Sequence, residues 1–344
     1  MSAISATMPL QQQQAIIDFL CRVAGAQDVQ LQTVKLLTGG AIQENWLLEL
    51  DVIGGNYAGH LAVVLRSDAA SAVSSSHSRA QEFALLQAAF AVGVTVPEPL
   101  WLGEKSVFGR DFFIMRKANG IAAGHRIVKD TSLGGDRELL TERMGEEMAR
   151  LHRIQPPNEN LAFLPMPQLS PALQGIQSFR QFLDQHHTPF PALEWGIRWL
   201  ERYAPQTTEL VLAHRDWRTG NYMLDEKSLT AILDWEFAAW SDRLEDIGWF
   251  CARCWRFGQF NNEAGGIGLR VALYRGYERI YGQPLDWQHV YYWEVYAHVR
   301  WAIIAIQQGE RHVSGQEPSL ELALTAHIVP ELELEILRMT LNHA

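Results

Sequence analysis

The sequence predicts an α+β protein with two lobes, a small lobe rich in strands followed by a larger, mainly helical lobe. The chain has 344 residues, of which 47% are hydrophobic, so it exceeds the length at which a single core usually stops growing. Short alternating runs of apolar and polar residues precede residue 118, whereas longer helical patterns follow residue 122. We therefore expect a tail and helix at 1–24, one lobe at 25–118 and a second lobe at 119–344.

Five short runs predict the strands of the first lobe. Each run alternates or is continuously apolar and is bounded by turn-forming residues, which is typical of strands. The runs occupy residues 31–37, 46–52, 61–65, 100–102 and 111–115. Between the third and fourth runs, residues 79–91 place Phe83, Leu86 and Phe90 at helical spacing, which predicts one helix there.

Long helical patterns predict the second lobe. They occupy residues 137–154, 179–182, 268–281 and 287–308. The last pattern carries an aromatic stripe, for which two interpretations are open: it packs the helix against its neighbours, or it forms a wall of a ligand pocket. The stripe consists of Trp287, Tyr291, Tyr292, Trp293, Tyr296 and Trp301.

Charge and hydropathy argue against two classes of partner. The net charge of -10 disfavours nucleic acid, because affinity for a phosphate backbone comes chiefly from Lys and Arg. The most apolar late stretch, 291–306, contains Glu294, His298 and Arg300, so it is too polar to span a bilayer. The first residues lack the basic start and apolar core of a secretory signal. We therefore expect a cytoplasmic protein that binds neither nucleic acid nor membrane.

Two of the three cysteines form a Cys-x-x-Cys pair, Cys251 and Cys254. Such a pair can serve redox chemistry or metal binding, but a second pair is absent from the sequence. The interpretation that we favour is two small apolar residues one turn apart on a buried helix.

The strongest chemical pattern lies between residues 211 and 236. It reads His214-Arg-Asp216, then Asn221 five residues later, then a predicted hairpin turn at 225–228 and an apolar strand that carries Asp234. Phosphoryl transfer needs a carboxylate that orients a hydroxyl and accepts its proton, and Asn and Asp oxygens that hold Mg²⁺ on the phosphates. The pattern supplies each of these groups. The alternative is a chance loop of polar residues between apolar strands.

This pattern resembles the catalytic core of the aminoglycoside phosphotransferase and choline kinase superfamily. The resemblance covers most of the chain, since residues 37–45 are similar to the family's nucleotide loop, 112–120 to its hinge, and 241–249 to the stretch after its metal-binding aspartate. It implies a protein-kinase-like fold, with a small five-stranded antiparallel N-lobe that binds the nucleotide and a larger, mainly helical C-lobe that supplies catalysis and the acceptor site.

The resemblance also implies a role for each residue of the core. Asp216 would be the catalytic base, and Asn221 and Asp234 would bind magnesium. His214 would support the loop, and Asp246 would brace the loop's backbone.

Further residues would hold the nucleotide. The backbone of Gly39 and Gly40, in a turn between the first two strands, would close over the phosphates, although two glycines between strands usually mean only a tight turn. The hinge backbone would pair with adenine, and it consists of Met115, Arg116, Lys117 and Ala118.

Arg66 departs from the commoner pattern, because many kinases have Lys on the third strand. A pair between Arg66 and Glu82 would preserve the role, since a guanidinium binds both carboxylate and phosphate. In having arginine at this position, the chain resembles the branch of kinase domains that are linked to acyl-CoA dehydrogenases. The alternative is an arginine at the end of a strand that faces water.

Two other arginines flank the predicted base. Arg215 replaces the Gly of most small-molecule kinases of this superfamily. Arg218 would either offset charge on the transferring phosphoryl group or form a surface salt bridge.

The resemblance therefore implies an ATP- and Mg²⁺-dependent phosphotransferase with an alcohol group as acceptor. The sequence leaves the acceptor open among an aminoglycoside, a hydroxyacyl thioester, an amino alcohol and a sugar, and it leaves the oligomeric state open. A catalytically silent nucleotide-binding module, a pseudokinase, is the alternative from another class.

Overall fold

The computed structural model describes residues 8–37, 43–68, 77–207 and 209–341. The chain divides into two compact units. The first unit runs to Gly120 and includes Glu159–Phe163 and Leu229–Phe237, while the remaining residues form the second unit. The predicted α+β class is confirmed, and a functional division between residues 118 and 119 stays a prediction.

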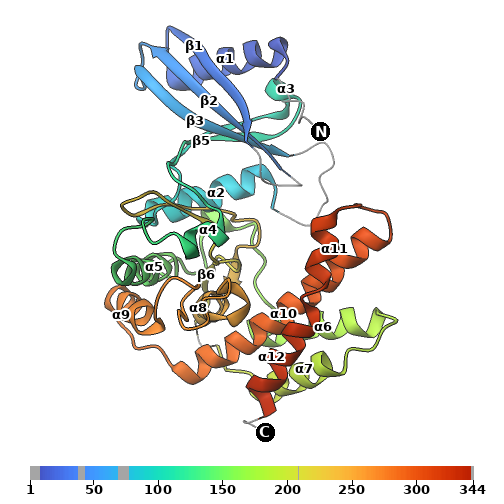
Figure 1. The fold of residues 1–344 in the computed structure, drawn as a ribbon. Helices are drawn as coiled ribbons and strands as arrows, with labels where there is room; N and C mark the ends of the chain where they lie inside the picture. Colours follow the sequence, from blue (N-terminus) through green and yellow to red (C-terminus); the bar gives the residue numbers. More distant parts are fainter. Residues whose placement is uncertain (1–7, 38–42, 69–76, 208, 342–344) are drawn as a thin grey trace. The chain divides into compact units, whose positions relative to one another are not determined.

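A five-stranded antiparallel sheet is the centre of the first unit (Figure 1). Its strands are β1 (Asp28–Leu37), β2 (Gln43–Ile53), β3 (Gly59–Asp68), β4 (Pro99–Gly103) and β5 (Phe112–Arg116). They lie in the order β1-β2-β3-β5-β4, and every neighbouring pair is antiparallel. All five predicted strands are present, and most extend beyond the predicted runs.

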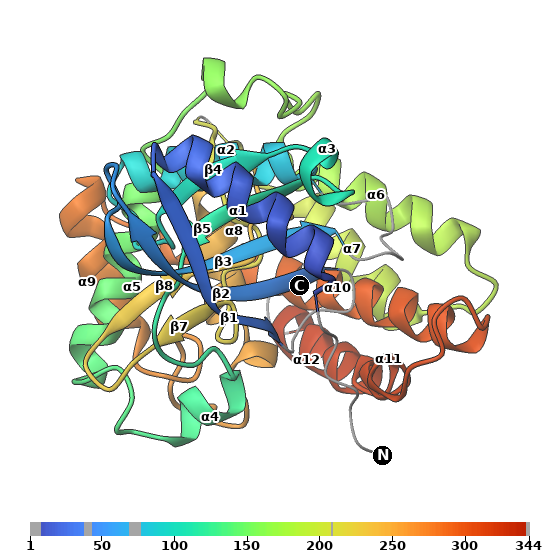
Figure 2. The same cartoon turned by 90° about the horizontal axis from the view of Figure 1, so that it is seen from above.

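Helices α1 (Leu10–Ala24) and α2 (Arg79–Ala91) pack on opposite faces of this sheet. Phe19 of α1 meets Phe112 at a ring distance of 5.3 Å, and Phe83 of α2 meets Phe113 at 5.8 Å. Because successive residues of a strand point to opposite faces, the two contacts place the helices on different sides. Figure 2 shows α1 lying across the strands.

Helix α2 has the bounds that the sequence predicts. The Ser78 side chain accepts the backbone N–H of Gln81, and the Gln81 side chain accepts that of Ser78. This reciprocal capping fixes where the helix begins. Two short elements of this unit were not predicted, namely α3 (Lys105–Phe108) and a 3₁₀ turn η1 (Glu159–Leu161). A third, β8 (Leu229–Ile232), is the apolar strand that the sequence predicts before Asp234.

The second unit is mainly helical. The four predicted helical patterns correspond to α5, α6, α9 and α10, although only four residues of α6 were predicted. Its elements are α4 (Gly124–Lys129), α5 (Arg137–Leu151), α6 (Pro171–Gln185), α7 (Pro191–Arg202), β6 (Val211–Ala213), β7 (Tyr222–Leu224), β9 (Ala239–Ser241), α8 (Arg243–Cys251), the 3₁₀ turn η2 (Arg253–Trp255), α9 (Arg270–Tyr281), α10 (Trp287–Val313), α11 (Leu320–Ala326) and α12 (Val329–Leu341).

Two glycines let α5 and α9 approach each other closely. A Cβ atom on Gly145 would lie 2.0 Å from the Leu273 carbonyl oxygen, and one on Gly276 would lie 1.9 Å from the Glu142 carbonyl oxygen. Real side chains do not fit at such distances, so both positions require glycine. The two helices therefore pack backbone to backbone.

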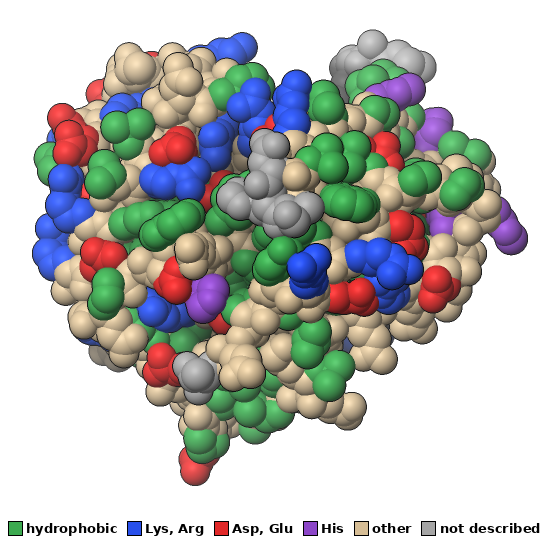
Figure 3. All heavy atoms as spheres, turned by 90° about the horizontal axis from the view of Figure 1, so that it is seen from below, with side chains coloured by type: hydrophobic (Ala, Val, Ile, Leu, Met, Phe, Trp, Pro, Cys, Tyr) green, Lys and Arg blue, Asp and Glu red, His purple; other side chains and the backbone are tan. Residues whose placement is uncertain are grey.

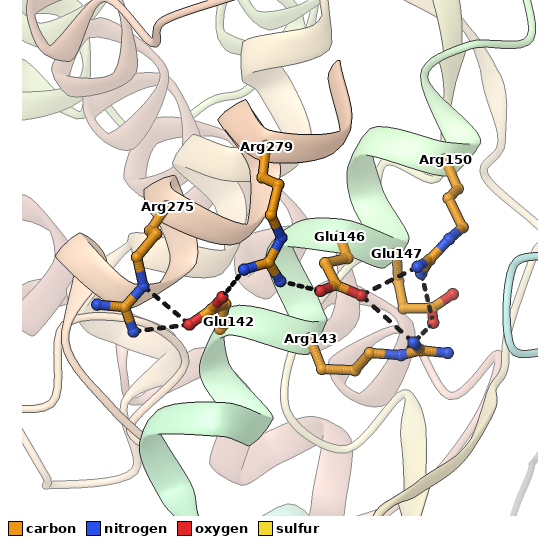
Figure 4. Close-up of polar contacts among 7 residues, drawn as sticks. All are labelled: Glu142, Arg143, Glu146, Glu147, Arg150, Arg275 and Arg279. Carbon is orange, nitrogen blue, oxygen red and sulfur yellow. Dashed lines mark hydrogen bonds and ion pairs between the residues drawn. The ribbon is translucent and has the colours of Figure 1, made fainter. Parts of the chain in front are cut away.

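A ladder of ion pairs runs along the same α5 and α9 contact, as Figure 4 shows. Its members are Glu142, Arg143, Glu146, Glu147, Arg150, Arg275 and Arg279. Glu147 is fully buried and pairs with Arg143 at 2.7 Å and with Arg150 at 3.0 Å. Hydrogen bonds from Arg275 and Arg279 lower the pKa of Glu142. We therefore assign the ladder a structural role.

The cysteine pair does not lie on one helix, which corrects the favoured interpretation. Helix α8 ends at Cys251, and Cys254 belongs to η2. Both thiols are free, and burial raises the pKa of each. They still behave as small packed residues, in line with that interpretation. In the described part of the chain, no helix combines the length and apolar character needed to cross a bilayer.

Candidate active site

Asp216 lies on the loop of residues 214–221, between strands β6 and β7 of the second unit. Its Oδ1 atom accepts a hydrogen bond from Trp249 Nε1 at 3.0 Å and one from Arg218 Nε at 3.3 Å. Its Oδ2 atom accepts one from Asn221 Nδ2 at 2.6 Å. The side chain is only 11% exposed. Both oxygens of the predicted base are thus held in a defined orientation.

Trp249 was not predicted to contact Asp216. It lies three residues after Asp246 on helix α8, and residues at this spacing share one helix face. Asp246 was assigned to the loop by resemblance, so the spacing could have placed Trp249 beside the loop as well.

Asp246 braces the backbone of the loop, as the resemblance implied. It is fully buried and accepts the backbone N–H of His214 at 2.7 Å and that of Arg215 at 2.6 Å. His152, at the end of α5, contacts Asp246 Oδ2 at 3.1 Å. Burial alone would raise the pKa of Asp246, but the hydrogen bonds and charge of His152 and the loop hold it below its usual value. His152 is a further contact that the sequence did not reveal.

His214 supports the loop from within the protein. The side chain is fully buried, and its Nδ1 atom accepts the backbone N–H of Asp216 at 3.2 Å. Arg218 pairs with Asp216 itself and lies over the Trp255 ring at 4.9 Å. The salt bridge expected as one alternative for Arg218 therefore involves the predicted base.

Arg215 has a backbone conformation that favours glycine, with φ of 62°. Its Nε atom pairs with Glu245 Oε1 at 3.0 Å, and its carbonyl oxygen accepts a bond from Arg300 at 2.6 Å. The negative charge of Glu245 raises the pKa of Arg215. The ion pair offsets a strained backbone, which explains how an arginine can replace the usual glycine.

We expect Arg215→Ala to be less stable than Arg215→Gly by about 1 kcal/mol. Both variants lose the pair with Glu245, but only alanine retains the strain of a positive φ. Urea unfolding of the parent and both variants measures the difference. Equal stability of the two variants would show that the backbone at this position is unstrained.

The first unit holds a chain of charged side chains, here called the Arg66 cluster: Asp68, Arg79, Glu82, Arg66 and Asp234. Arg66 Nε lies 2.8 Å from Glu82 Oε1, and Arg66 Nη2 lies 3.3 Å from Asp234 Oδ1. Burial opposes the charge on Arg66, but Glu82 and Asp234 outweigh this effect and raise its pKa. The side chain of Arg66 is only 11% exposed, so the alternative of an arginine facing water is wrong.

Arg79 and Asp68 were not predicted members of the cluster. Arg79 is 1% exposed, pairs with the second oxygen of Glu82, and meets Asp68 at 3.0 Å. Glu82 therefore lies between two arginines. The sequence indicates only weakly that Arg79 is buried, because an arginine at the first position of a helix usually points to solvent.

Asp234 is held on the first unit by its own segment. Ile232 donates its backbone N–H to Thr95 O at 2.8 Å, and Thr230 donates its hydroxyl to Asn119 O at 2.5 Å. Asp234 itself has φ of 69°, a conformation that is costly for a non-glycine residue and is frequent at functional sites. Its side chain stays 37% exposed, so it remains accessible.

The predicted hinge lies at the end of β5. The backbone N–H groups of Arg116 and Lys117 donate to Glu98 O at 2.9 Å and to Ala62 O at 3.0 Å. These two donors are therefore bound within the first unit, and the pairing of the hinge with adenine stays a prediction. Gly39 and Gly40 lie outside the described residues.

The sequence profile of the phosphotransferase enzyme family matches residues 33–288. Acyl-CoA dehydrogenase family member 11 of Rattus norvegicus is 27% identical over 309 residues, which are 83% of this chain and 38% of that protein. Family member 10 of Mus musculus is 29% identical over 186 residues, which are 52% of this chain and 17% of that protein. The chain thus spans less than half of either relative.

Solved structures show the same fold. A protein of Ralstonia eutropha assigned to the aminoglycoside phosphotransferases has a TM-score of 0.71 and 20% identity, and covers 93% of this chain and 95% of its own. Spectinomycin phosphotransferase, bound to ADP and spectinomycin, has a TM-score of 0.61 and 13% identity over 93% and 97% of the chains. The predicted kinase-like fold and the resemblance to both groups are therefore confirmed.

Proposed function

Because the chain belongs to the phosphotransferase enzyme family, we propose that it transfers the γ-phosphate of ATP to a hydroxyl group of a small molecule. The observation that carries this proposal is the arrangement at Asp216. Its two oxygens accept bonds from Trp249, Arg218 and Asn221, and the backbone that carries it is bound to Asp246. A carboxylate fixed in this way can orient a hydroxyl and accept its proton.

The oxygen donors of Asn221 and Asp234 suit Mg²⁺. The amide nitrogen of Asn221 is bound to Asp216, which leaves its oxygen as the atom for a cation. Across the described ranges, no three His, Cys, Asp or Glu side chains form a group that could hold a metal. Mg²⁺ usually keeps several waters and binds substrate phosphates, so it needs few protein ligands. When bound, the ion neutralises charge on the phosphates.

The Arg66 cluster is assigned to the phosphates of the nucleotide. Glu82 holds Arg66 through one nitrogen, and a second nitrogen reaches Asp234. Arg79 shares Glu82 and so fixes the carboxylate from its other side. With its carboxylate partner fixed, Arg66 can present its remaining N–H groups to phosphate oxygens. Gly39, Gly40 and the hinge 115–118 keep their predicted roles as part of the proposal.

Two sets of similar proteins support two different classes of acceptor. The structural neighbours include complexes with spectinomycin and with hygromycin B, which supports an aminoglycoside-like acceptor. The curated relatives are acyl-CoA dehydrogenase family members, which supports a hydroxyacyl thioester. A pseudokinase is favoured only by Arg66 in place of lysine, whereas Asp216, Asn221 and Asp234 are all present.

Asp234→Ala tests the proposal at the level of nucleotide binding. We expect the dissociation constant for AMP-PNP with Mg²⁺ to rise by about 10-fold or more, because the ion loses its anionic protein ligand. Calorimetry with and without Mg²⁺ measures the effect, and Asp18→Ala on the exposed face of α1 is a matched control. An unchanged affinity in the presence of Mg²⁺ would remove Asp234 from the metal site.

Arg66→Ala tests the phosphate contact. We expect it to weaken AMP-PNP binding by about 10- to 100-fold, as loss of charged hydrogen bonds costs about 1.5–3 kcal/mol, and to lower turnover as well. Arg66→Lys should recover part of the loss, since an ammonium cannot serve both carboxylates with the same geometry. Arg22→Ala, on α1 of the same unit, is the control. Parental affinity and turnover in Arg66→Ala would place the phosphate contact elsewhere.

A further inference from the structure

Arg300 of α10 is a buried cation beside the 214–221 loop. On the face drawn in Figure 3, Lys and Arg side chains are exposed and are mixed with acidic ones. Arg300 differs, because it is only 8% exposed, and burial lowers its pKa. A buried charge is costly unless it is paired and hydrogen-bonded. The groups that the Arg300 guanidinium contacts therefore indicate what the residue does.

The first contact is with the peptide group that joins Arg215 to Asp216. Arg300 Nη1 donates to the Arg215 carbonyl oxygen at 2.6 Å. The N–H of the same peptide group belongs to Asp216 and donates to His214 Nδ1 at 3.2 Å. Both polar atoms of this peptide group are thus bound, the oxygen to α10 and the nitrogen to the loop itself. Because φ of Arg215 is 62°, the conformation persists only if its surroundings hold it.

The second contact is with the side chain that donates to the Asp216 carboxylate. The Arg300 guanidinium lies over the Trp249 ring, 4.5 Å from its centroid, within the range of a cation–π interaction. The indole N–H of Trp249 donates to Asp216 Oδ1 at 3.0 Å. Trp249 directly follows Gly248, where α8 and α10 pack closely, since a Cβ atom on Gly248 would lie 2.4 Å from Trp293 Cβ. Arg300 therefore confines the indole that orients the carboxylate.

Glu245 is the carboxylate that Arg300 shares with Arg215. Its Oε1 atom lies 3.5 Å from Arg300 Nη1 and 3.0 Å from Arg215 Nε. The charge of Arg215 opposes the charge on Arg300, whereas the charges of Glu245 and Asp216 favour it. One carboxylate cannot neutralise two guanidinium groups, so these three side chains together keep a positive charge. Asp216 thus belongs to the charge balance around Arg300.

Arg256 shows what a buried arginine with a structural role looks like in the same unit. It is also 8% exposed, and it donates to the backbone carbonyls of Cys251 and Phe260. In the described part of the chain, none of its hydrogen bonds or ion pairs involves the 214–221 loop. Arg256 and Arg300 therefore form a matched pair that differs in contact with the loop.

We propose that Arg300 is a positioning residue for phosphoryl transfer, which acts on Asp216 through the Arg215–Asp216 peptide group and through Trp249. This proposal rests on the proposed function. Arg300 contacts neither the nucleotide nor the acceptor in this assignment. It fixes the direction in which Asp216 presents its carboxylate to the acceptor hydroxyl, and proton transfer depends steeply on that direction.

Arg300→Met tests the proposal, because methionine keeps the apolar stem and removes the charge and the donors. We expect kcat to fall about 10- to 100-fold, as a displacement of about 1 Å can cause. The KM for ATP should stay within about twofold, since the phosphates are assigned to the Arg66 cluster. Arg300→Lys should recover part of the loss, because an ammonium can still donate to the Arg215 carbonyl. Arg256→Met, the matched control, should keep kcat within about twofold.

The kinetic measurement is ADP formation from ATP with Mg²⁺. The acceptor is whichever of kanamycin, 3-hydroxybutyryl-CoA, ethanolamine, glucose and water gives the highest rate with the parent. A double-mutant cycle adds Trp249→Phe, which removes the indole N–H. If Arg300 acts in part through Trp249, Arg300→Met should cost at least threefold less in the Trp249→Phe background, because coupled residues are not additive.

A spectroscopic readout needs no turnover. In protein labelled with ¹⁵N at tryptophan, the indole signal of Trp249 is identified by its loss in Trp249→Phe. Hydrogen exchange of this N–H should be at least 10-fold faster in Arg300→Met than in the parent, because the indole is no longer confined beside Asp216. The rate in Arg256→Met should equal the parental rate.

Three results would overturn the proposal. They are a fall in kcat no larger than that of Arg256→Met, a KM for ATP that rises as much as kcat falls, and unchanged exchange of the Trp249 indole in Arg300→Met. Urea unfolding shows whether Arg300→Met is folded, and Arg300→Lys takes its place in the same comparisons if it is not. A parent that consumes no ATP with any acceptor contradicts the proposed function, and the indole exchange then decides whether Arg300 holds Trp249 beside Asp216.

Discussion

Asp216→Asn should lower turnover by about 100- to 10,000-fold, the usual contribution of a general base. The amide cannot accept the hydroxyl proton. The Arg66 cluster does not include Asp216, so the affinity for AMP-PNP with Mg²⁺ should stay within about twofold of the parent. Steady-state turnover and calorimetry on the same preparation separate the two effects.

The control for this variant is Asp184→Asn, an exposed aspartate on α6 of the same unit. A modest loss of stability in Asp216→Asn is also expected, about 1–2 kcal/mol, because either amide orientation places an N–H₂ group against a donor. Urea unfolding measures this loss separately. Turnover within a few-fold of the parent would exclude Asp216 as the base.

Asp246→Asn should destabilise the protein by about 3 kcal/mol, since it removes a buried charge that accepts bonds from two backbone N–H groups and from His152. The 214–221 loop loses its brace, so turnover should fall as well. Urea unfolding at neutral pH measures the stability. Asp286→Asn is a matched control, because Asp286 caps α10 and asparagine caps helices equally well.

The effect of Asp246 also depends on pH. Its pKa in the folded protein lies below its usual value, so its contribution is present above the unfolded pKa of about 3.9 and is lost as the pH falls below it. The difference in free energy of unfolding between parent and Asp246→Asn should therefore shrink below about pH 4. A constant difference down to acid pH would show that Asp246 stabilises the fold without its charge.

The residues that sequence reasoning placed correctly belong to one short stretch or follow it closely. Asp216 and Asn221 share a loop, and this loop lies between strands β6 and β7. Asp216 and Asn221 are only five residues apart, and phosphoryl transfer requires these residue types together. The five strands of the sheet were also predicted, because each carries a run that alternates or is continuously apolar.

The missed residues differ in how much the sequence showed. His152 contacts Asp246 from the end of α5, and no spacing in the sequence brings these two residues together. Trp249 lies three residues after Asp246, and Arg79 lies three residues before Glu82, so their spacing on one helix could have indicated both contacts. Strands β6 and β9 have only three residues each, which is too short for a period to be visible.

The members of the aromatic stripe do not all have the same surroundings. Trp293 and Tyr296 are buried in the helical packing, whereas Trp301 and His298 line a cavity of about 420 Å³. All of these residues lie on α10, so the periodicity of the sequence could not distinguish a residue buried in helix packing from one that lines a cavity. The difference arises from what packs against each turn of α10.

Phosphorus NMR of the parent with ATP, Mg²⁺ and hydroxyl compounds of each proposed acceptor class tests the central claim most directly. Transfer predicts that the γ-phosphate signal is lost with equal formation of ADP and of a phosphate monoester, or of inorganic phosphate where water is the acceptor. This loss should require Mg²⁺ and should be abolished in Asp216→Asn. If the parent binds ATP with Mg²⁺ but consumes it no faster than Asp216→Asn does with any acceptor or with water, the chain is a silent nucleotide-binding module and not a phosphotransferase.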